Sequence, residues 1–295
     1  MEMHQLRYFL AVAQAGSFTR AAAKCRVAQP SLSQQILKLE SELGEKLFER
    51  QRQRVTLTAV GERFRQRAER IQWETGEALR EVRETQEQPR GKVELGVLPT
   101  IAPFLLPDLL AEFGSAHSEI EVILHEETTS RLLRMVDSGE VHLAMVSLPI
   151  AGSRFQTRPL FKEELLLALP RRHSLANRKA ITLADLESER FIVMQESHCL
   201  GTQSLQFCHA RGFSPQVSCR SAQIETLQAM VKSGLGISLV PEMARRSAPK
   251  GIVYRSLSGA KPMRSIGLIW SKRLEVPRAG RELAAFLEKK LRRTG

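Results

Sequence analysis

Two cysteines in the second half of the chain have the type and spacing for thiol redox chemistry. Cys199 follows His198 and precedes a segment with helical character, Leu200–Arg211, which contains Cys208. At the N-terminus of a helix, free backbone N–H groups and the helix dipole favour a thiolate, so we expect a lowered pKa for Cys199. A reactive thiolate attacks peroxide, and the sulfenic acid that forms can condense with a second thiol.

The spacing of these two cysteines restricts how they can bond. Nine steps along an intact helix place the Cα atoms of Cys199 and Cys208 about 13.5 Å apart. A disulfide needs Cα atoms within roughly 7 Å of each other. The helix must therefore unfold before the bond forms, and oxidation would act as a conformational switch.

Composition indicates what kind of chain carries these thiols. The 295 residues are 42% hydrophobic and 26% charged, which is typical of a soluble protein of two or three domains. No apolar run is long enough to cross a membrane and the first residues lack a secretory signal, so we expect a cytoplasmic protein. The net charge of +12 favours an anionic partner such as nucleic acid, although the basic residues are spread along the whole chain.

The first sixty residues have the pattern of a helix-turn-helix. An apolar stripe predicts a first helix that ends at Gly16, and Ser17 is placed to cap a second helix. Pro30 suits the first turn of a third helix, in which Leu32, Ile36, Leu39 and Leu43 form the inner face. The expected DNA-contacting residues around its outer face are Gln29, Pro30, Ser31, Ser33, Gln34 and Lys38.

Alternating arginines follow the third helix. Arg50, Arg52 and Arg54 precede the β-prone triplet Val55-Thr56-Leu57, which predicts a hairpin wing whose side chains reach DNA phosphates. A solvated surface would explain either feature alone, but not both at this spacing.

The segment Leu6–Gly61 resembles the LysR-type regulators. Its matching motifs include Gly16-Ser17-Phe18, Gln29-Pro30-Ser31-Leu32-Ser33, Leu47-Phe48-Glu49-Arg50 and Leu57-Thr58-Ala59-Val60-Gly61. Ala28 departs from the family pattern, which often has Ser or Thr there, so the third helix loses a capping hydroxyl. The resemblance implies double-stranded operator DNA as a partner and contact with RNA polymerase.

A long helix is predicted from Thr58 onward, with Thr58 able to act as its N-cap. Its seam of heptad-like spacing comprises Phe64, Ala68, Ile71, Thr75, Ala78 and Val82. About 28 residues would extend about 42 Å, too far for one small domain to cover, so we expect a homodimer. The resemblance also implies a homotetramer. We therefore predict a winged helix-turn-helix over residues 1–58, a dimerisation helix over 59–90 and an effector domain over 91–295.

Strand-like and helix-like segments alternate after Gly91, which predicts an α/β class with parallel sheets. Two such sets indicate two lobes with a ligand-binding cleft between them. The family resemblance implies the same two-lobed, periplasmic-binding-protein-like domain. Lobe I would hold residues 91–161 and 267–295, and lobe II would hold residues 162–266.

The cysteine region resembles the OxyR-like, peroxide-sensing group within this family. The match includes His198-Cys199-Leu200, Gln203, Phe207-Cys208 and Glu225-Thr226-Leu227. It implies that Cys199 reacts with hydrogen peroxide, that Cys208 resolves the product, and that Thr100, Thr129, His198 and Arg264 form the peroxide pocket. Gly201-Thr202 stands where that group usually has Arg-Asp.

Two other interpretations remain open. A LysR-type regulator could bind a small metabolite in the lobe cleft and keep its cysteines as structural residues. A thiol peroxidase could use Cys199, but it would leave the winged helix unexplained, so we expect no enzyme. The scattered histidines have no metal-ligand spacing, and no cofactor is expected.

Overall fold

The computed structural model describes residues 1–51, 54–83, 89–195 and 199–292, and it describes only the backbone of residues 50, 51, 54, 77 and 79–83. The chain forms two compact units, one made mainly of residues 1–87 and one made mainly of residues 88–295. Within the described ranges, no helix is both long and apolar enough to span a lipid bilayer.

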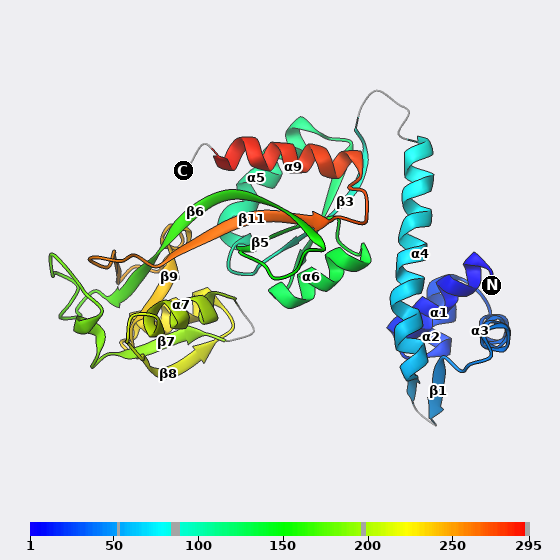
Figure 1. Cartoon of the computed structure of the whole chain (residues 1–295), viewed down its shortest axis with the longest axis horizontal. Helices are drawn as coiled ribbons and strands as arrows, with labels where there is room; N and C mark the ends of the chain where they lie inside the picture. Colours follow the sequence, from blue (N-terminus) through cyan, green and yellow to red (C-terminus); the bar gives the residue numbers. More distant parts are fainter. Residues whose placement is uncertain (52–53, 84–88, 196–198, 293–295) are drawn as a thin grey trace. The chain divides into compact units, whose positions relative to one another are not determined.

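The first unit is a winged helix-turn-helix followed by a long helix (Figure 1). Its elements are α1 (Met3–Ala15), α2 (Phe18–Cys25), α3 (Gln29–Leu43), β1 (Phe48–Gln51), β2 (Arg54–Leu57) and α4 (Ala59–Arg83). Gly16 ends α1 with a left-handed backbone (φ +60°) that a glycine adopts without strain. The Ser17 hydroxyl accepts the N–H of Arg20 and caps α2, as predicted.

Helix α4 contributes its first half to the core of this unit. Phe9 is fully buried, with its ring centroid 5.2 Å from Phe48 and 5.0 Å from Phe64 of α4. Ala68 is also fully buried there. The prediction that Ala68 belongs to a dimer seam is therefore wrong, because its own domain covers it. Phe64 is only half-buried, so its place in the seam stays a prediction.

The remaining seam positions lie in the second half of α4. Ile71 is 36% exposed, Ala78 is exposed and Thr75 is half-buried. The side chain of Val82 lies outside the described residues. At 25 residues, α4 extends about 37 Å.

The second unit is a two-lobed α/β domain. Its seven-stranded sheet has the order β10-β6-β11-β5-β3-β4, and β9 pairs with β6. The strands and helices are β3 (Gly91–Val97), α5 (Ala102–Ala116), β4 (Ile120–Glu126), α6 (Thr129–Ser138), β5 (Leu143–Leu148), β6 (Phe155–Pro170), β7 (Arg190–Met194), α7 (Cys199–His209), β8 (Gln216–Ser221), α8 (Ile224–Lys232), β9 (Ser238–Pro241), β10 (Ile252–Arg255), β11 (Met263–Ser271) and α9 (Arg278–Leu291). Short 3₁₀ helices span Ala184–Leu186 and Glu242–Arg245.

The α/β class is confirmed, but the main sheet is mixed rather than parallel. β3 pairs in parallel with β4 and β5, whereas β6 and β11 pair antiparallel over nine residues of β11. β6 is a 16-residue strand that continues beyond β11 to pair with β9 and β10. Only parallel neighbours need a helical crossover. The alternation of strands and helices in the sequence therefore could not reveal that β6 and β11 are antiparallel neighbours.

Each lobe has its own hydrophobic core. The core of lobe I gathers the buried residues of β3, β5, α5, α6 and α9, and Figure 1 shows α6 and α9 on opposite sides of the sheet. The other gathers β7, α7, α8, β9 and the second half of β6. β6 and β11 therefore connect two separately packed lobes, and the site lies where these strands pass between them.

Candidate functional site

Helix α3 has the polar surface expected of a recognition helix. Leu32, Ile36 and Leu39 are fully buried, as predicted. Leu43 is 39% exposed, so its predicted place on the inner face is wrong; it is the last residue before Gly44 ends the helix. The exposed residues of the predicted DNA-contacting set are Gln29, Pro30, Ser31, Gln34 and Lys38, and Ser33 is half-buried.

A buried carboxylate joins α3 to the wing. Glu40 is 9% exposed, and its Oε1 accepts the N–H of Leu47 at 2.8 Å and the N–H of Phe48 at 3.1 Å. The Thr58 hydroxyl accepts the N–H of Gly61 at 2.9 Å, which caps α4 as predicted. The Glu40 bonds hold the start of the hairpin against α3, and the Thr58 hydroxyl also donates to the Lys46 carbonyl at 2.8 Å, which ties the residue after the hairpin to the residues before it.

The wing itself is a short antiparallel hairpin. Phe48 pairs with Leu57 at the open end of the hairpin, and Gln51 pairs with Arg54 next to the turn. The backbone therefore has the predicted form, while the side chains of Arg50 and Arg54 and the whole of Arg52 lie outside the described residues.

The two thiols lie on one helix of lobe II but pack against the cores of different lobes. Cys199, the first residue of α7, is half-buried against the core of lobe I. Cys208 is 1% exposed in the core of lobe II. Nine residues at 100° each rotate Cys208 to the opposite face of the helix. Both thiols are free, and α7 is continuous between them.

Burial dominates the electrostatics of both thiols. It raises the pKa of Cys199 above its ordinary value by more than the Thr129 hydroxyl and the Arg264 guanidinium lower it. The expected lowering is therefore wrong, because the first turn of α7 lies inside the protein rather than in solvent. Burial also raises the pKa of Cys208 to about 11, against the opposing charge of Arg211.

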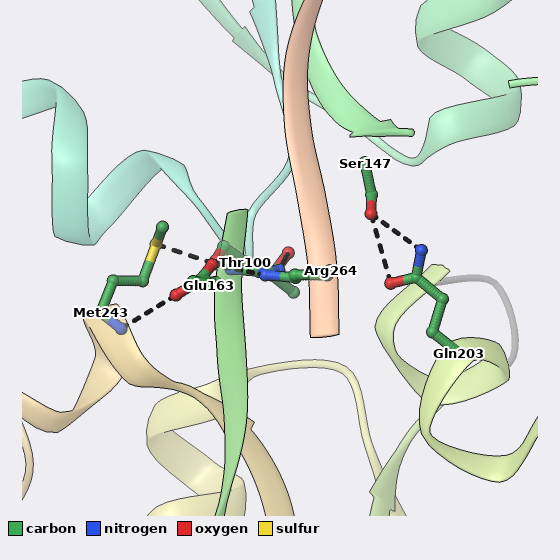
Figure 2. A network of polar contacts seen from close by, with 6 residues as sticks. All are labelled: Thr100, Ser147, Glu163, Gln203, Met243 and Arg264. Atoms are coloured by element: carbon green, nitrogen blue, oxygen red, sulfur yellow. Dashed lines mark hydrogen bonds and ion pairs between the residues drawn. The ribbon is translucent and has the colours of Figure 1, made fainter. Parts of the chain in front are cut away.

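A fully buried arginine, Arg264 of β11, lies where the long strands β6 and β11 cross from one lobe to the other (Figure 2). Arg264 Nε donates to Glu163 Oε1 at 2.6 Å, and its two terminal nitrogens donate to the Thr100 hydroxyl and carbonyl at 3.1 Å each. The other carboxylate oxygen of Glu163 accepts the N–H of Met243 at 3.0 Å. Arg264 is thus a fixed positive charge, paired with one carboxylate, close enough to Cys199 to affect its pKa.

Thr129 is the first residue of α6 and lies beside the same thiol. Among the described residues its buried hydroxyl has no hydrogen-bond partner. The structure thus brings together Cys199, Thr129, Arg264 and, through Arg264, Thr100. His198, also predicted for this pocket, lies outside the described residues.

A second polar contact crosses between the lobes at α7. The Ser147 hydroxyl, at the carboxyl end of β5, donates to Gln203 Oε1 at 3.2 Å and accepts from Gln203 Nε2 at 2.8 Å (Figure 2). Sequence reasoning did not single out Ser147 or Glu163 as site residues. Glu163 could have been suspected from its charge beside the apolar run Leu165–Leu169, whereas Ser147 only ends an apolar strand.

Gly201 has a structural reason to be glycine. A Cβ at this position would lie 2.3 Å from the Met194 carbonyl oxygen and 3.0 Å from that of Gln195. α7 therefore rests with its first turn directly on the end of β7. No described contact explains Thr202.

No group of three or more potential metal-binding side chains occurs among the residues that the structure covers.

A winged helix joined to a two-lobed α/β domain is the architecture of a ligand- or signal-responsive DNA-binding regulator.

Comparison with known proteins agrees with this class. Residues 3–62 match the model for the bacterial regulatory helix-turn-helix protein, lysR family, and residues 86–292 match the LysR substrate binding domain. The chain therefore belongs to the LysR family of transcriptional regulators.

Individual relatives are similar over nearly the whole chain. The DNA-binding transcriptional dual regulator OxyR of Escherichia coli K12 is 36% identical over 273 residues, covering 92% of this chain and 89% of its own. A full-length OxyR variant from Pseudomonas aeruginosa superimposes with a TM-score of 0.80 at 31% identity, covering 97% and 94%. A Corynebacterium glutamicum OxyR mutant, solved with H2O2 bound, gives 0.64 at 27% identity, covering 98% and 93%.

Proposed function

We propose that this regulator responds to hydrogen peroxide through Cys199 and Cys208. The observation that carries the proposal is the placement of Cys199, close enough to Thr129 and Arg264 for both to lower its pKa, at the start of a helix that holds Cys208 on its opposite face. Relatives named as hydrogen peroxide-inducible activators support it. These comparisons favour peroxide over a metabolite as the signal.

The proposed pocket is formed by Thr100, Thr129, His198 and Arg264. The Thr129 hydroxyl and the Arg264 guanidinium are donors placed to hold a peroxide oxygen near the thiol. Cys199 sulfur attacks one peroxide oxygen, the O–O bond breaks, and a sulfenic acid and water form. Cys208 sulfur then attacks Cys199 sulfur, forming the disulfide and releasing a second water. Two thiols thus supply the two electrons.

One equivalent of hydrogen peroxide should convert the reduced protein to a Cys199–Cys208 disulfide, detected by peptide mass spectrometry. Because burial raises the pKa of Cys199, only a small thiolate fraction exists near neutrality. The rate of Cys199 oxidation should therefore rise about tenfold per pH unit between pH 6 and 8. Cys208→Ser should stop the reaction at the sulfenic acid.

Cys219→Ser is the matched control, since Cys219 is a half-buried thiol on β8, and it should leave the linkage unchanged. If Cys199 stays unoxidised after peroxide treatment, the proposal is refuted. A rate independent of pH would show that the thiol has a low pKa instead. Sustained peroxide consumption with a thiol reductant would favour a thiol peroxidase.

For DNA, we propose that α3 enters the major groove and that the wing contacts phosphates. The exposed amides and hydroxyls of α3, with Gln34 and Lys38 farther along it, suit base edges and backbone. The exposed half of α4, around Ile71, would pair with a second copy, so that two recognition helices bind a symmetric site. A tetramer and contact with RNA polymerase stay predictions, as do the domain boundaries given above.

DNA affinity should fall steeply with salt because each phosphate contact releases a counterion. On a duplex enriched by selection with the protein itself, Arg52→Ala should weaken binding and reduce the magnitude of the salt slope by about one. Gln34→Ala should instead relax discrimination between bases, with the slope unchanged. Fluorescence anisotropy at several salt concentrations measures both effects, and a salt-independent affinity would contradict the wing assignment.

A further inference from the structure

Helix α7 is attached to both lobes of the effector domain. Leu200 and Cys208 pack in the core of lobe II, whereas Cys199 packs against the core of lobe I. Gln203 lies four residues after Cys199, so both residues face the same side of the helix. Cys208 lies on the opposite face. One face of α7 therefore contacts lobe I through two side chains, the thiol of Cys199 and the amide of Gln203.

The partner of Gln203 is a buried side chain of lobe I. Ser147 is 3% exposed, and its backbone pairs with Ile266 of β11. Both hydrogen bonds that its hydroxyl makes within the described part of the chain go to the Gln203 amide, at 2.8 and 3.2 Å (Figure 2). The bonds of Ser147 thus cross between the lobes rather than supporting lobe I itself.

We propose that Ser147 and Gln203 are positioning residues that hold α7 in its reduced, helical arrangement and so set the balance between dithiol and disulfide. The inference rests on the proposed function. A Cys199–Cys208 bond requires α7 to unwind and its lobe I face to leave the lobe. That movement breaks the Ser147–Gln203 contact, which therefore stabilises only the dithiol.

The test is the equilibrium of the full-length protein with glutathione. Oxidised glutathione and the protein dithiol exchange to give the protein disulfide and two reduced glutathione molecules, and mass spectrometry gives each fraction. Ser147→Ala removes both hydrogen bonds to Gln203, and at the lower end of their net strength this should shift the equilibrium constant about fivefold toward the disulfide. That corresponds to a reduction potential lower by about 20 mV.

A second measurement needs no disulfide. In the fully reduced protein, Cys208 is buried, so its alkylation reports how often α7 opens. Ser147→Ala should raise the alkylation rate of Cys208 by a similar factor. This arm tests the contact even if the wild-type protein forms no disulfide, an outcome that would overturn the proposed function instead.

Ser271→Ala is the matched control. Ser271 is 5% exposed at the end of β11, and its hydroxyl accepts the N–H of Arg273 within the same lobe. It should change neither measurement. Gln203→Ala and the Ser147→Ala/Gln203→Ala double variant should each give the same shift as Ser147→Ala, because the two residues act through one contact. Wild-type values for Ser147→Ala, or additive shifts in the double variant, would refute the proposal.

Discussion

Replacing Arg264 by methionine should lower the free energy of unfolding of the effector domain by about 3–5 kcal/mol. The side chain is fully buried, and its removal leaves the Glu163 carboxylate, 6% exposed, without its counter-charge. It also leaves the Thr100 carbonyl without the donor that Arg264 supplies. Urea unfolding followed by tryptophan fluorescence measures the loss, with Trp270 on the same strand as a reporter.

Two further variants separate the causes of this loss. Arg264→Met/Glu163→Leu removes both charges and should recover a large part of the stability, because an uncompensated buried charge costs more than a lost pair. Arg158→Ala removes an arginine that is 48% exposed and paired with Glu288, and should cost less than about 1 kcal/mol. If Arg264→Met costs no more than Arg158→Ala, the pair between the lobes is not buried as described.

Replacing Gly201 by alanine should lower the free energy of unfolding by about 1–3 kcal/mol, although alanine favours helix formation. The new Cβ would lie 2.3 Å from a backbone oxygen of Met194, and a backbone cannot rotate away as a side chain can. α7 must then lift from β7. We expect faster alkylation of Cys199 and Cys208 in the reduced protein, since both thiols are held by this helix.

Gly114→Ala, which also changes a glycine in a helix, should have the opposite effect on stability. Gly114 lies in α5, and nothing would approach its added Cβ within 4 Å. Alanine should therefore stabilise the protein by up to about 1 kcal/mol through helix propensity alone. A stabilising Gly201→Ala of similar size would mean that α7 is not seated on β7.

The glycine at 201 shows where local reasoning stops. From the sequence, a glycine in the first helical turn only weakens a helix. In the structure it permits a close approach of α7 to the end of β7, so propensity and packing act in opposite directions and the backbone contact decides.

Local signals were sufficient for the first unit. The end of α1 at Gly16, the start of α3 around Pro30, the caps Ser17 and Thr58 and the apolar face of α3 all depend on neighbours a few residues away. They failed at Leu43 and Ala68, where burial depends on which distant element lies opposite. The buried Glu40, which holds the start of the wing, carried no local signal at all.

By itself, the sequence determined that Cys199 and Cys208 lie on one helix, too far apart to form a disulfide while that helix is intact, because helix geometry is local. Only the tertiary structure decided how those thiols are held. Burial of the first turn of α7 reversed the expected direction of the Cys199 pKa, because desolvation depends on everything packed around a group. The partners Glu163 and Ser147 lie 101 and 56 residues from the groups they bind, a separation that no pattern along the chain can bridge.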